Sequence, residues 1–390
     1  MAFFSAAPKH RNLLQILFGL LAICGAVGCL TAQTAVDPWP EVVPGIEYIH
    51  QRIGSQPWSV HAVKIDRSVD SFYFLSTLAQ GQIKGLAPLT RQIESIPQSC
   101  GKPLAAINAD FFRIQPGPYQ GDPTGLQIVQ GELVSDPGDT SLWFDPNGRP
   151  HIAPVVSNFQ CTAPDQKTFP FRLNQERAEN AAVLFTPAFG PSTCTAAGTE
   201  LILEKTPAGP WLPLQVGMQF QAQIRTISPA GDTAIEPDTL VLSLGPGMLA
   251  SLPDFQPGMT LSFSLQTQPD LTGVPTALGG HPILLQNGKM PGGLDEKSRH
   301  PRSAFGWNDQ FFFLVVVDGR QKGLSIGMTF PELARLMQQF GCNEAVNLDG
   351  GGSSTLWLGG KILNSPSDGR QRSIANGLIL MQKVNPNPEK

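Results

Sequence analysis

Aspartates follow three apolar runs of the chain, at the places where buried strands would end. Residues 104–107 lead to Asn108 and Asp110, Phe311–Val317 leads to Asp318, and residues 345–348 lead to Asp349. Turns at the ends of buried strands are where open sheets place their ligands. Because Asp is also an ordinary turn former, one such aspartate would carry little weight. The coincidence of three predicts a cleft shared by Asp110, Asp318 and Asp349.

A run of glycine and serine follows Asp349 directly, in the segment NLDGGGSST at residues 347–355. Gly350, Gly351 and Gly352 allow positive φ angles and a close approach of the backbone to a ligand. Successive N–H groups of such a loop can hold an anion, and the hydroxyls of Ser353 and Ser354 add donors. The segment lacks the GK[ST] of a P-loop and the G-x-S-x-G of a nucleophile elbow. It predicts a cradle for an anionic ligand, with a plain glycine hairpin as the alternative.

Arginines suited to phosphate stand near these segments, because a planar guanidinium offers paired hydrogen bonds. They are Arg302 in HPRSA, Arg320 in DGR and Arg372 in RQRSIANG, and each one alone could equally be a solvated surface residue. Arg302 gains weight from its place between a Gly280–His281 turn and a buried strand. All three arginines are therefore candidate phosphate ligands.

Metal binding stays open at this point. Asp110, Asp318 and Asp349 are oxygen ligands of the kind that hard cations accept, although no spacing between them selects a metal. The sequence requires no cofactor, and a divalent cation remains an alternative. No Cys or His spacing is that of a structural zinc site.

The elements that must position these residues predict an α+β fold, with a mixed β-sheet core, few helices and a β-rich middle segment. The 40 Gly and 36 Pro are scattered through the chain and indicate many turns between short strands. Strands are expected at residues 58–65 and 72–75, near a sheet edge, and a short helix over residues 86–96. Phe311–Val317 reads as a strand buried on both faces.

A strand, helix and strand close the chain. Thr329 and Glu332 form a capping box for an amphipathic helix that ends before Gly341. Residues 345–348 then predict another buried strand, so this order indicates a crossover unit. Upstream, residues 151–276 predict a β-rich insertion, with strands at 200–204, 218–227, 239–244 and 259–265.

The first residues predict export. Lys9 and Arg11 precede an apolar run at residues 13–27 that is too short for a confident membrane span. We assign residues 1–28 to a signal peptide, 29–45 to a linker, and 46–385 to one domain that contains the 151–276 segment. The small residues from Ala26 to Gly28 suit a signal-peptidase cleavage site just before Cys29. A lipid attached to Cys29 would then be the one expected link to a membrane. The expected location is periplasmic, extracellular or lipid-anchored at the envelope.

The amino-acid composition also narrows the class of protein. With 41% hydrophobic and 15% charged residues, the chain is typical of a folded globular protein. A formal charge of −4 and the lack of a basic stripe exclude nucleic acid as an expected partner. In an exported protein, Cys100, Cys161, Cys194 and Cys342 allow two disulfides in three pairings, with four buried thiols as the alternative.

Several of these motifs together resemble the phosphodiester glycosidase family. The resemblance rests on NADFF, GGHPIL, HPRSAFG, VVVDGR with its following helix, and NLDGGGSST, and extends over residues 40–381. It implies hydrolysis of the bond between a sugar's anomeric carbon and a phosphodiester oxygen. Carboxylates would then stabilise an oxocarbenium-like transition state or direct water, while arginines and N–H groups stabilise the departing phosphate. By their positions in these motifs, the resemblance implies that Asp349, Asp318 and Asp110 activate water or stabilise the cation. It likewise implies that Arg302 and Arg372 bind the phosphate, that residues 350–354 cradle the ligand, and that Asn108 and His281 orient it.

The expected partner is thus a sugar-phosphodiester or polysaccharide substrate. Two other interpretations stay open. One is a non-catalytic module that binds envelope polysaccharide, and the other is a structural periplasmic protein whose glycine loop is only a turn.

Overall fold

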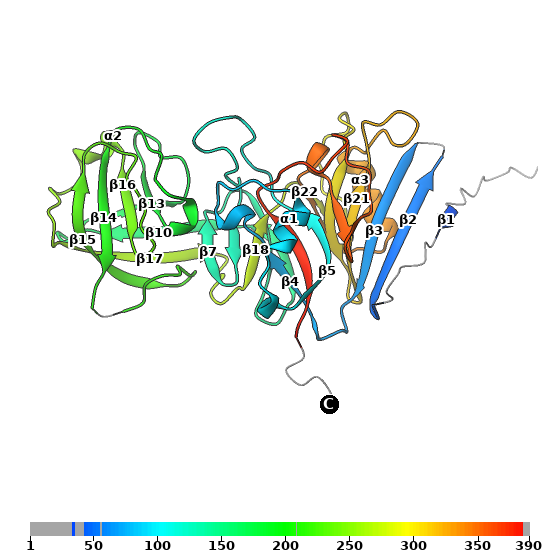
Figure 1. Ribbon diagram of the computed structural model, residues 1–390, viewed down its shortest axis with the longest axis horizontal. Coiled ribbons are helices and arrows are strands. Elements are labelled where there is room, and N and C mark those ends of the chain that lie inside the picture. The colour runs from blue at the N-terminus through cyan, green and yellow to red at the C-terminus, as the bar shows by residue number, and fades with distance from the viewer. Residues whose placement is uncertain (1–32, 36–42, 55–56, 208, 385–390) are drawn as a thin grey trace, which may run out of the picture. The chain divides into compact units, whose positions relative to one another are not determined.

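The computed structural model describes residues 33–35, 43–54, 57–207 and 209–384 (Figure 1). The predicted signal peptide and Cys29 lie outside the described residues. Within the predicted linker, Gln33–Ala35 forms β1, which pairs with β2 (Ile46–Ile53). None of the helices in the described part of the chain has the length and hydropathy of a membrane span. The proposed domain boundaries stay predictions.

Strands make up 42% of the protein and helices 9%. The prediction of a β-sheet core with few helices is confirmed, but the strands of that core pair antiparallel instead of forming a mixed sheet. The protein is also richer in β-structure than an α+β fold implies. The reason lies in the short helices: α1 covers only Leu89–Glu94 because Pro88 precedes it, and α2 covers only Pro246–Leu249. Further short 3-10 turns occupy Ala79–Gly81, Gln98–Cys100, Pro187–Phe189 and Gly351–Ser353.

A seven-stranded sheet has the order β1-β2-β3-β21-β20-β22-β19. Its remaining strands are β3 (Trp58–Asp66), β19 (Ile283–Leu285), β20 (Arg302–Trp307), β21 (Phe311–Val317) and β22 (Glu344–Leu348). β21 is buried as predicted, with only Phe311 partly exposed. The prediction that β3 lies near an edge is wrong, because β3 lies between β2 and β21. Its polar residues Ser59 and His61 are both buried and hydrogen-bonded, as suits a central strand.

The helix α3 (Phe330–Gln339) connects β21 to β22. Both bonds of its predicted capping box are present, since Glu332 N–H donates to Thr329 and the Thr329 N–H donates to Glu332. β21 and β22 both run antiparallel to β20 between them, so they run in the same direction. The predicted crossover therefore forms, with one strand inserted in its middle. The apolar side of α3, including Leu333 and Met337, packs on this sheet.

A five-stranded sheet with the order β24-β23-β5-β25-β4 packs against the other face of the seven-stranded sheet. Its strands are β4 (Phe72–Ser76), β5 (Lys102–Asn108), β23 (Leu356–Leu358), β24 (Lys361–Ile362) and β25 (Gly377–Gln382). Ile107, Phe305 and Leu348 belong to the apolar core between the two sheets. β5 and β22 thus belong to different layers of one core.

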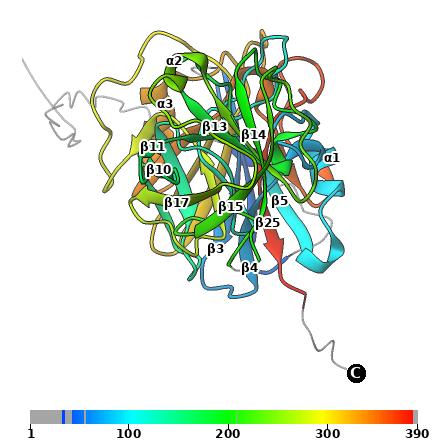
Figure 2. The same cartoon turned by 90° about the vertical axis from the view of Figure 1, so that its left-hand side faces the viewer.

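The middle of the chain forms an eight-stranded sheet with the order β11-β10-β17-β15-β14-β16-β13-β12, seen from one side in Figure 2. Its strands are β10 (Val156–Thr162), β11 (Thr168–Pro170), β12 (Arg172–Leu173), β13 (Ala182–Phe185), β14 (Thr199–Lys205), β15 (Gln219–Ser228), β16 (Leu240–Leu244) and β17 (Thr260–Gln268). The four strands predicted in this segment are confirmed as β14 to β17.

A further five-stranded sheet has the order β7-β6-β18-β8-β9. It consists of β6 (Gln127–Val129), β7 (Glu132–Ser135), β8 (Thr140–Phe144), β9 (Pro150–Pro154) and β18 (Thr276–Gly279). β18 ends at Gly279, next to the predicted Gly280–His281 turn.

The described cysteines are free thiols, so the predicted disulfides are absent among them. Cys161 and Cys342 are buried in two different apolar clusters, while Cys100 and Cys194 are partly exposed beside two others. This separation explains why no pair forms.

Candidate active site

The ends of β5 and β22 meet although the strands belong to different sheets. The Asp349 N–H donates to the Ala109 carbonyl at 2.8 Å, and Asn108 Nδ2 donates to the Asp349 carbonyl at 2.6 Å. Asn108 Oδ1 accepts from Ser303 Oγ at 2.7 Å and from the Thr355 N–H at 3.0 Å. Asn108 is buried, so it ties these segments together and brings Asp110 next to Asp349.

Asp110 lies beneath this junction and is 4% exposed. Its N–H donates to Asn376 Oδ1 at 2.8 Å, and the Gly125 N–H donates to its Oδ2 at 2.9 Å. Burial raises the pKa of Asp110 to about 7, and the charge of Asp349 raises it further, while the backbone N–H groups of Gly125 and Phe111 lower it. A Cβ at Gly279 would lie 2.5 Å from Asp110 Oδ2, so this carboxyl group needs glycine beside it.

Asp349 keeps partial contact with solvent. Burial by the surrounding protein raises its pKa to about 6, although the Ser353 hydroxyl and the positive charge of Arg372 both lower it. Two neighbouring carboxyl groups therefore titrate near neutral pH. Such pairs are typical of acid–base sites.

The glycine loop forms a short 3-10 turn in which Gly351 has a φ of +62°. Its N–H groups are largely used inside the protein: Gly351 donates to the Pro301 carbonyl at 2.9 Å, Ser353 to Gly350 at 3.2 Å, and Ser354 to Gly351 at 3.3 Å. Ser353 and Ser354 are buried. The backbone cradle predicted from the glycines is therefore smaller than expected.

Two guanidinium groups cover the loop instead. A Cβ at Gly352 would collide with Arg372, and a Cβ at Gly351 would lie 3.1 Å from both terminal nitrogens of Arg320. Arg372 Nη2 donates to Asp368 at 2.9 Å, and its Nη1 lies 3.5 Å from Ser353 Oγ. Arg320 is exposed, and its Nη2 lies 3.2 Å from His300 Nδ1. The loop glycines thus make room for arginine side chains.

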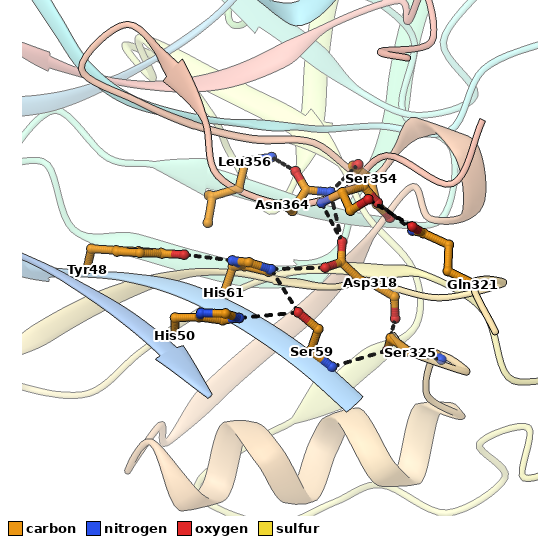
Figure 3. A network of polar contacts seen from close by, with 12 residues as sticks. Tyr48, His50, Ser59, His61, Asp318, Gln321, Ser325, Ser354, Leu356 and Asn364 are labelled. Carbon is orange, nitrogen blue, oxygen red and sulfur yellow. Dashed lines mark hydrogen bonds and ion pairs between the residues drawn. The ribbon is translucent and has the colours of Figure 1, made fainter. Parts of the chain in front are cut away.

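Asp318 has a different environment, inside a network of polar contacts (Figure 3). It is 1% exposed, and its Oδ2 lies 3.0 Å from His61 Nε2. Its Oδ1 accepts from the Ser365 N–H at 2.8 Å and from Asn364 Nδ2 at 3.3 Å. Asn364 Nδ2 also donates to the Ser354 carbonyl at 3.0 Å. Asp318 therefore reaches the glycine loop through Asn364.

The same network contains Ser59, His61 and Asp318, but not in the arrangement of a serine hydrolase. Ser59 Oγ and Asp318 Oδ2 both approach His61 Nε2, at 3.1 and 3.0 Å, while Tyr48 OH lies 2.7 Å from His61 Nδ1 (Figure 3). A catalytic triad needs the serine and the aspartate on opposite ring nitrogens. All three residues are also buried. The network holds β2, β3 and the Asp318 turn together.

The structure places Arg302 away from the carboxyl pair. Side chains alternate along β20, so Ser303 faces Asn108 while Arg302 faces the side covered by α3. Arg302 donates to the carbonyls of Met328 and Ser298, both at 2.8 Å, and stacks over Phe330. Burial lowers its pKa to about 10.

His281 follows β18 beside the site, and its side chain is 62% exposed. Its Nδ1 lies 3.3 Å from Asp139 Oδ2, and its carbonyl accepts from Asn347 Nδ2 at 2.7 Å. It is thus the predicted orienting residue that remains open to a ligand. No cluster of three or more His, Cys, Asp or Glu with metal-binding geometry occurs among the described residues.

Sequence reasoning missed Gly125, Asn364 and Asn376, and weighed Arg320 without assigning it. Asn376 and Gly125 contact Asp110 only because β25 pairs with β5 and the loop after Asp110 folds back. In the sequence both have the look of ordinary turn residues. Arg320 has a positive φ of +58°, and no sequence pattern around it predicts this backbone conformation.

Comparison with known proteins bears on this site. Residues 230–381 match the model of the phosphodiester glycosidase family. The resemblance predicted from the sequence is thereby confirmed over that segment, which holds Arg320, Asp349 and Arg372, whereas Asp110 lies before it.

Similar proteins are distant or short matches. A prophage-derived uncharacterized protein of Bacillus subtilis (strain 168), YomE, is 38% identical over 87 residues, which are 22% of this chain and 13% of that protein. This chain therefore spans a small part of that relative's length.

Solved structures share the fold. A hypothetical protein from Synechocystis is 22% identical with a TM-score of 0.68, over 87% of this chain and 62% of that one. A Burkholderia pseudomallei K96243 protein, named for predicted export, is 21% identical with a TM-score of 0.64, over 85% of this chain and 74% of that one. A zebrafish N-acetylglucosamine-1-phosphodiester alpha-N-acetylglucosaminidase catalytic domain is 14% identical with a TM-score of 0.46, over 90% of this chain and 88% of that one, too distant a likeness to carry weight.

Proposed function

We propose that the protein is an exported hydrolase that cleaves the bond between an anomeric sugar carbon and a phosphodiester, in an envelope or extracellular glycan. One observation carries this proposal: Asp110 and Asp349, with pKa values raised to about 7 and about 6, adjoin a loop covered by Arg372. The match to the phosphodiester glycosidase family over residues 230–381 supports it.

The chemistry needs a negative charge near the anomeric carbon and positive charge near the leaving phosphate. Asp349 is the carboxyl group with solvent contact, and its ionised form would take a proton from water or stabilise the oxocarbenium-like carbon. The hydroxyl of that water joins the carbon, and the sugar–oxygen bond electrons leave with the phosphate as a monoester. Arg372, beside Ser353 and Asp349, stabilises the growing phosphate charge.

We assign the other residues to different tasks. Asp110 is buried and stays protonated up to pH about 7, partly because of the charge of Asp349, so it serves as a neutral neighbour that adds no second negative charge to the site. Arg320 replaces Arg302 as the second phosphate-binding arginine, because Arg320 lies over Gly351 whereas Arg302 bonds to backbone carbonyls. Asp318 is a positioning residue for the loop.

The test is turnover of sugar-phosphate diesters. The protein should release free sugar from UDP-N-acetylglucosamine or from a nitrophenyl-phosphate sugar diester, and Asp349→Asn should abolish release without lowering the unfolding temperature. Arg372→Gln should slow turnover, while Lys322→Gln, an exposed charge near Arg320, should not. If a broad panel of such diesters stays intact, the enzymatic proposal fails and a polysaccharide-binding role gains support.

A further inference from the structure

The eight-stranded sheet carries an outward face made of neutral polar side chains. Along β10, β15 and β17, every second residue points into the core, including Phe159, Phe220 and Phe263. The residues between them face outward and are at least partly exposed. This face lies on a part of the chain to which no role has been assigned above.

The outward residues form two rows across three neighbouring strands. β17 lies between β10 and β15, as the strand order in Figure 2 shows. The register places Gln160 opposite Ser264 and Ser264 opposite Gln219. In the next row, Thr162 is opposite Ser262 and Ser262 is opposite Gln221. These six side chains line a shallow hollow of about 470 Å³.

The rows on either side of the hollow are also polar, and charge enters only at one border, where Glu204 of β14 is opposite Gln223. Asn158 and Gln266 form the next row at one end, and Gln223 and Thr260 form the next row at the other. The solvent face of an antiparallel sheet normally carries Lys, Glu and other charges, which keep it soluble and prevent unwanted pairing. The six side chains that line the hollow are nevertheless all neutral amides and hydroxyls, which is the composition of a surface that binds a neutral polar ligand.

We propose that this face binds a neutral polysaccharide chain. Amide side chains offer both donors and acceptors, and Ser and Thr hydroxyls offer the same pair, which matches the hydroxyl groups of a sugar. Within each row the side chains stand on neighbouring strands about 4.8 Å apart, so one extended chain can contact three strands in turn. A charged polymer would lack ion-pair partners here, so a neutral chain fits best.

Most side chains of the face are available for such contacts, while the Thr162 hydroxyl lies 3.2 Å from that of Thr168. Within the described residues the one hydrogen bond between members of the two rows is that from Gln221 to Ser262, and it is long at 3.5 Å. Gln223 Nε2 is tied to the Gly258 carbonyl at 2.9 Å and so belongs to the rim. The binding face is distinct from the carboxyl pair, and the inference does not depend on turnover there.

The experiment is native electrophoresis of the full chain through gels that contain laminarin, hydroxyethyl cellulose or starch, with dextran sulfate as the charged comparison. The wild-type protein should be retarded by at least one neutral glucan and not by dextran sulfate. Ser264→Glu, which places a charge in the middle of the face, should weaken binding at least tenfold. Ser251→Glu, at an exposed serine away from the face, is the matched control.

Two controls keep the result interpretable. Equal unfolding temperatures of Ser264→Glu and the wild-type protein show that the sheet is intact, and Asp349→Asn should bind glucan as well as the wild-type protein does. Retardation by none of the neutral glucans overturns the inference, as does equal retardation of Ser264→Glu. Sedimentation that shows a dimer dissolved by Ser264→Glu would instead identify a surface for a second copy and would also overturn it.

Discussion

Asp110→Asn should make the protein more stable at high pH. A carboxyl group whose pKa is raised on folding contributes its full stability below the unfolded pKa and loses it as the pH rises through the folded pKa. For Asp110 that window runs from 3.8 to about 7. The shift of about three units, at ~1.4 kcal/mol each, gives an upper limit of ~4 kcal/mol of lost stability above pH 7.

Asn removes the charge and keeps an oxygen to accept the Gly125 N–H bond. We therefore expect Asp110→Asn to match the wild-type protein near pH 4 and to exceed its unfolding free energy by ~1–4 kcal/mol at pH 8. Urea unfolding followed by tryptophan fluorescence at several pH values measures this. Asp270→Asn is the control of opposite sign, because hydrogen bonds from Thr272 lower the pKa of Asp270. A gain that is absent at pH 8, or equal at every pH, would refute the reasoning about Asp110.

Four other predictions follow from the same contacts. Turnover should rise with pH as Asp349 ionises near pH 6 and fall as Asp110 ionises near pH 7. Asp110→Asn should remove the fall, and a rate profile that is flat from pH 5 to 8 would contradict these assignments. Gly279→Ala should displace Asp110 and reduce turnover at least tenfold, whereas Gly292→Ala, with open space around it, should change nothing. Asp318→Asn should cost ~2–4 kcal/mol of unfolding free energy, because it replaces one accepting oxygen with an NH2 group that must face either His61 or the donors of Asn364 and Ser365; unchanged urea midpoints would argue against that network. A reducing agent should leave the unfolding temperature unchanged, and peptide mapping should find no disulfide between Cys100, Cys161, Cys194 and Cys342.

Parts of the fold could be predicted from the sequence because their signals are local. An unbroken apolar run defined β21, and the Thr329–Glu332 spacing located the start of α3. The ends of β5 and β22 were found because polar residues follow short apolar runs there. The extent of β-structure was underestimated, since many of the strands have only three to five residues and weak periodicity.

The candidate site shows where local patterns stop being informative. Asp318 and Asp349 follow their strands in the same manner, yet one accepts hydrogen bonds from His61, Asn364 and Ser365 while the other keeps contact with solvent. No residue near Asp318 in the sequence indicates that it will contact His61, which is 257 residues away.

The sequence by itself determined which residue types are present, which segments become buried strands, and that carboxylates and glycines stand at their ends. Tertiary structure decided which of these groups share a site. Strand pairing sets the face of each side chain, so Ser303 meets Asn108 while its neighbour Arg302 faces α3. Packing of two sheets brings Asp110 beside Asp349, and burial at that junction, a property of neither segment alone, raises the pKa of both.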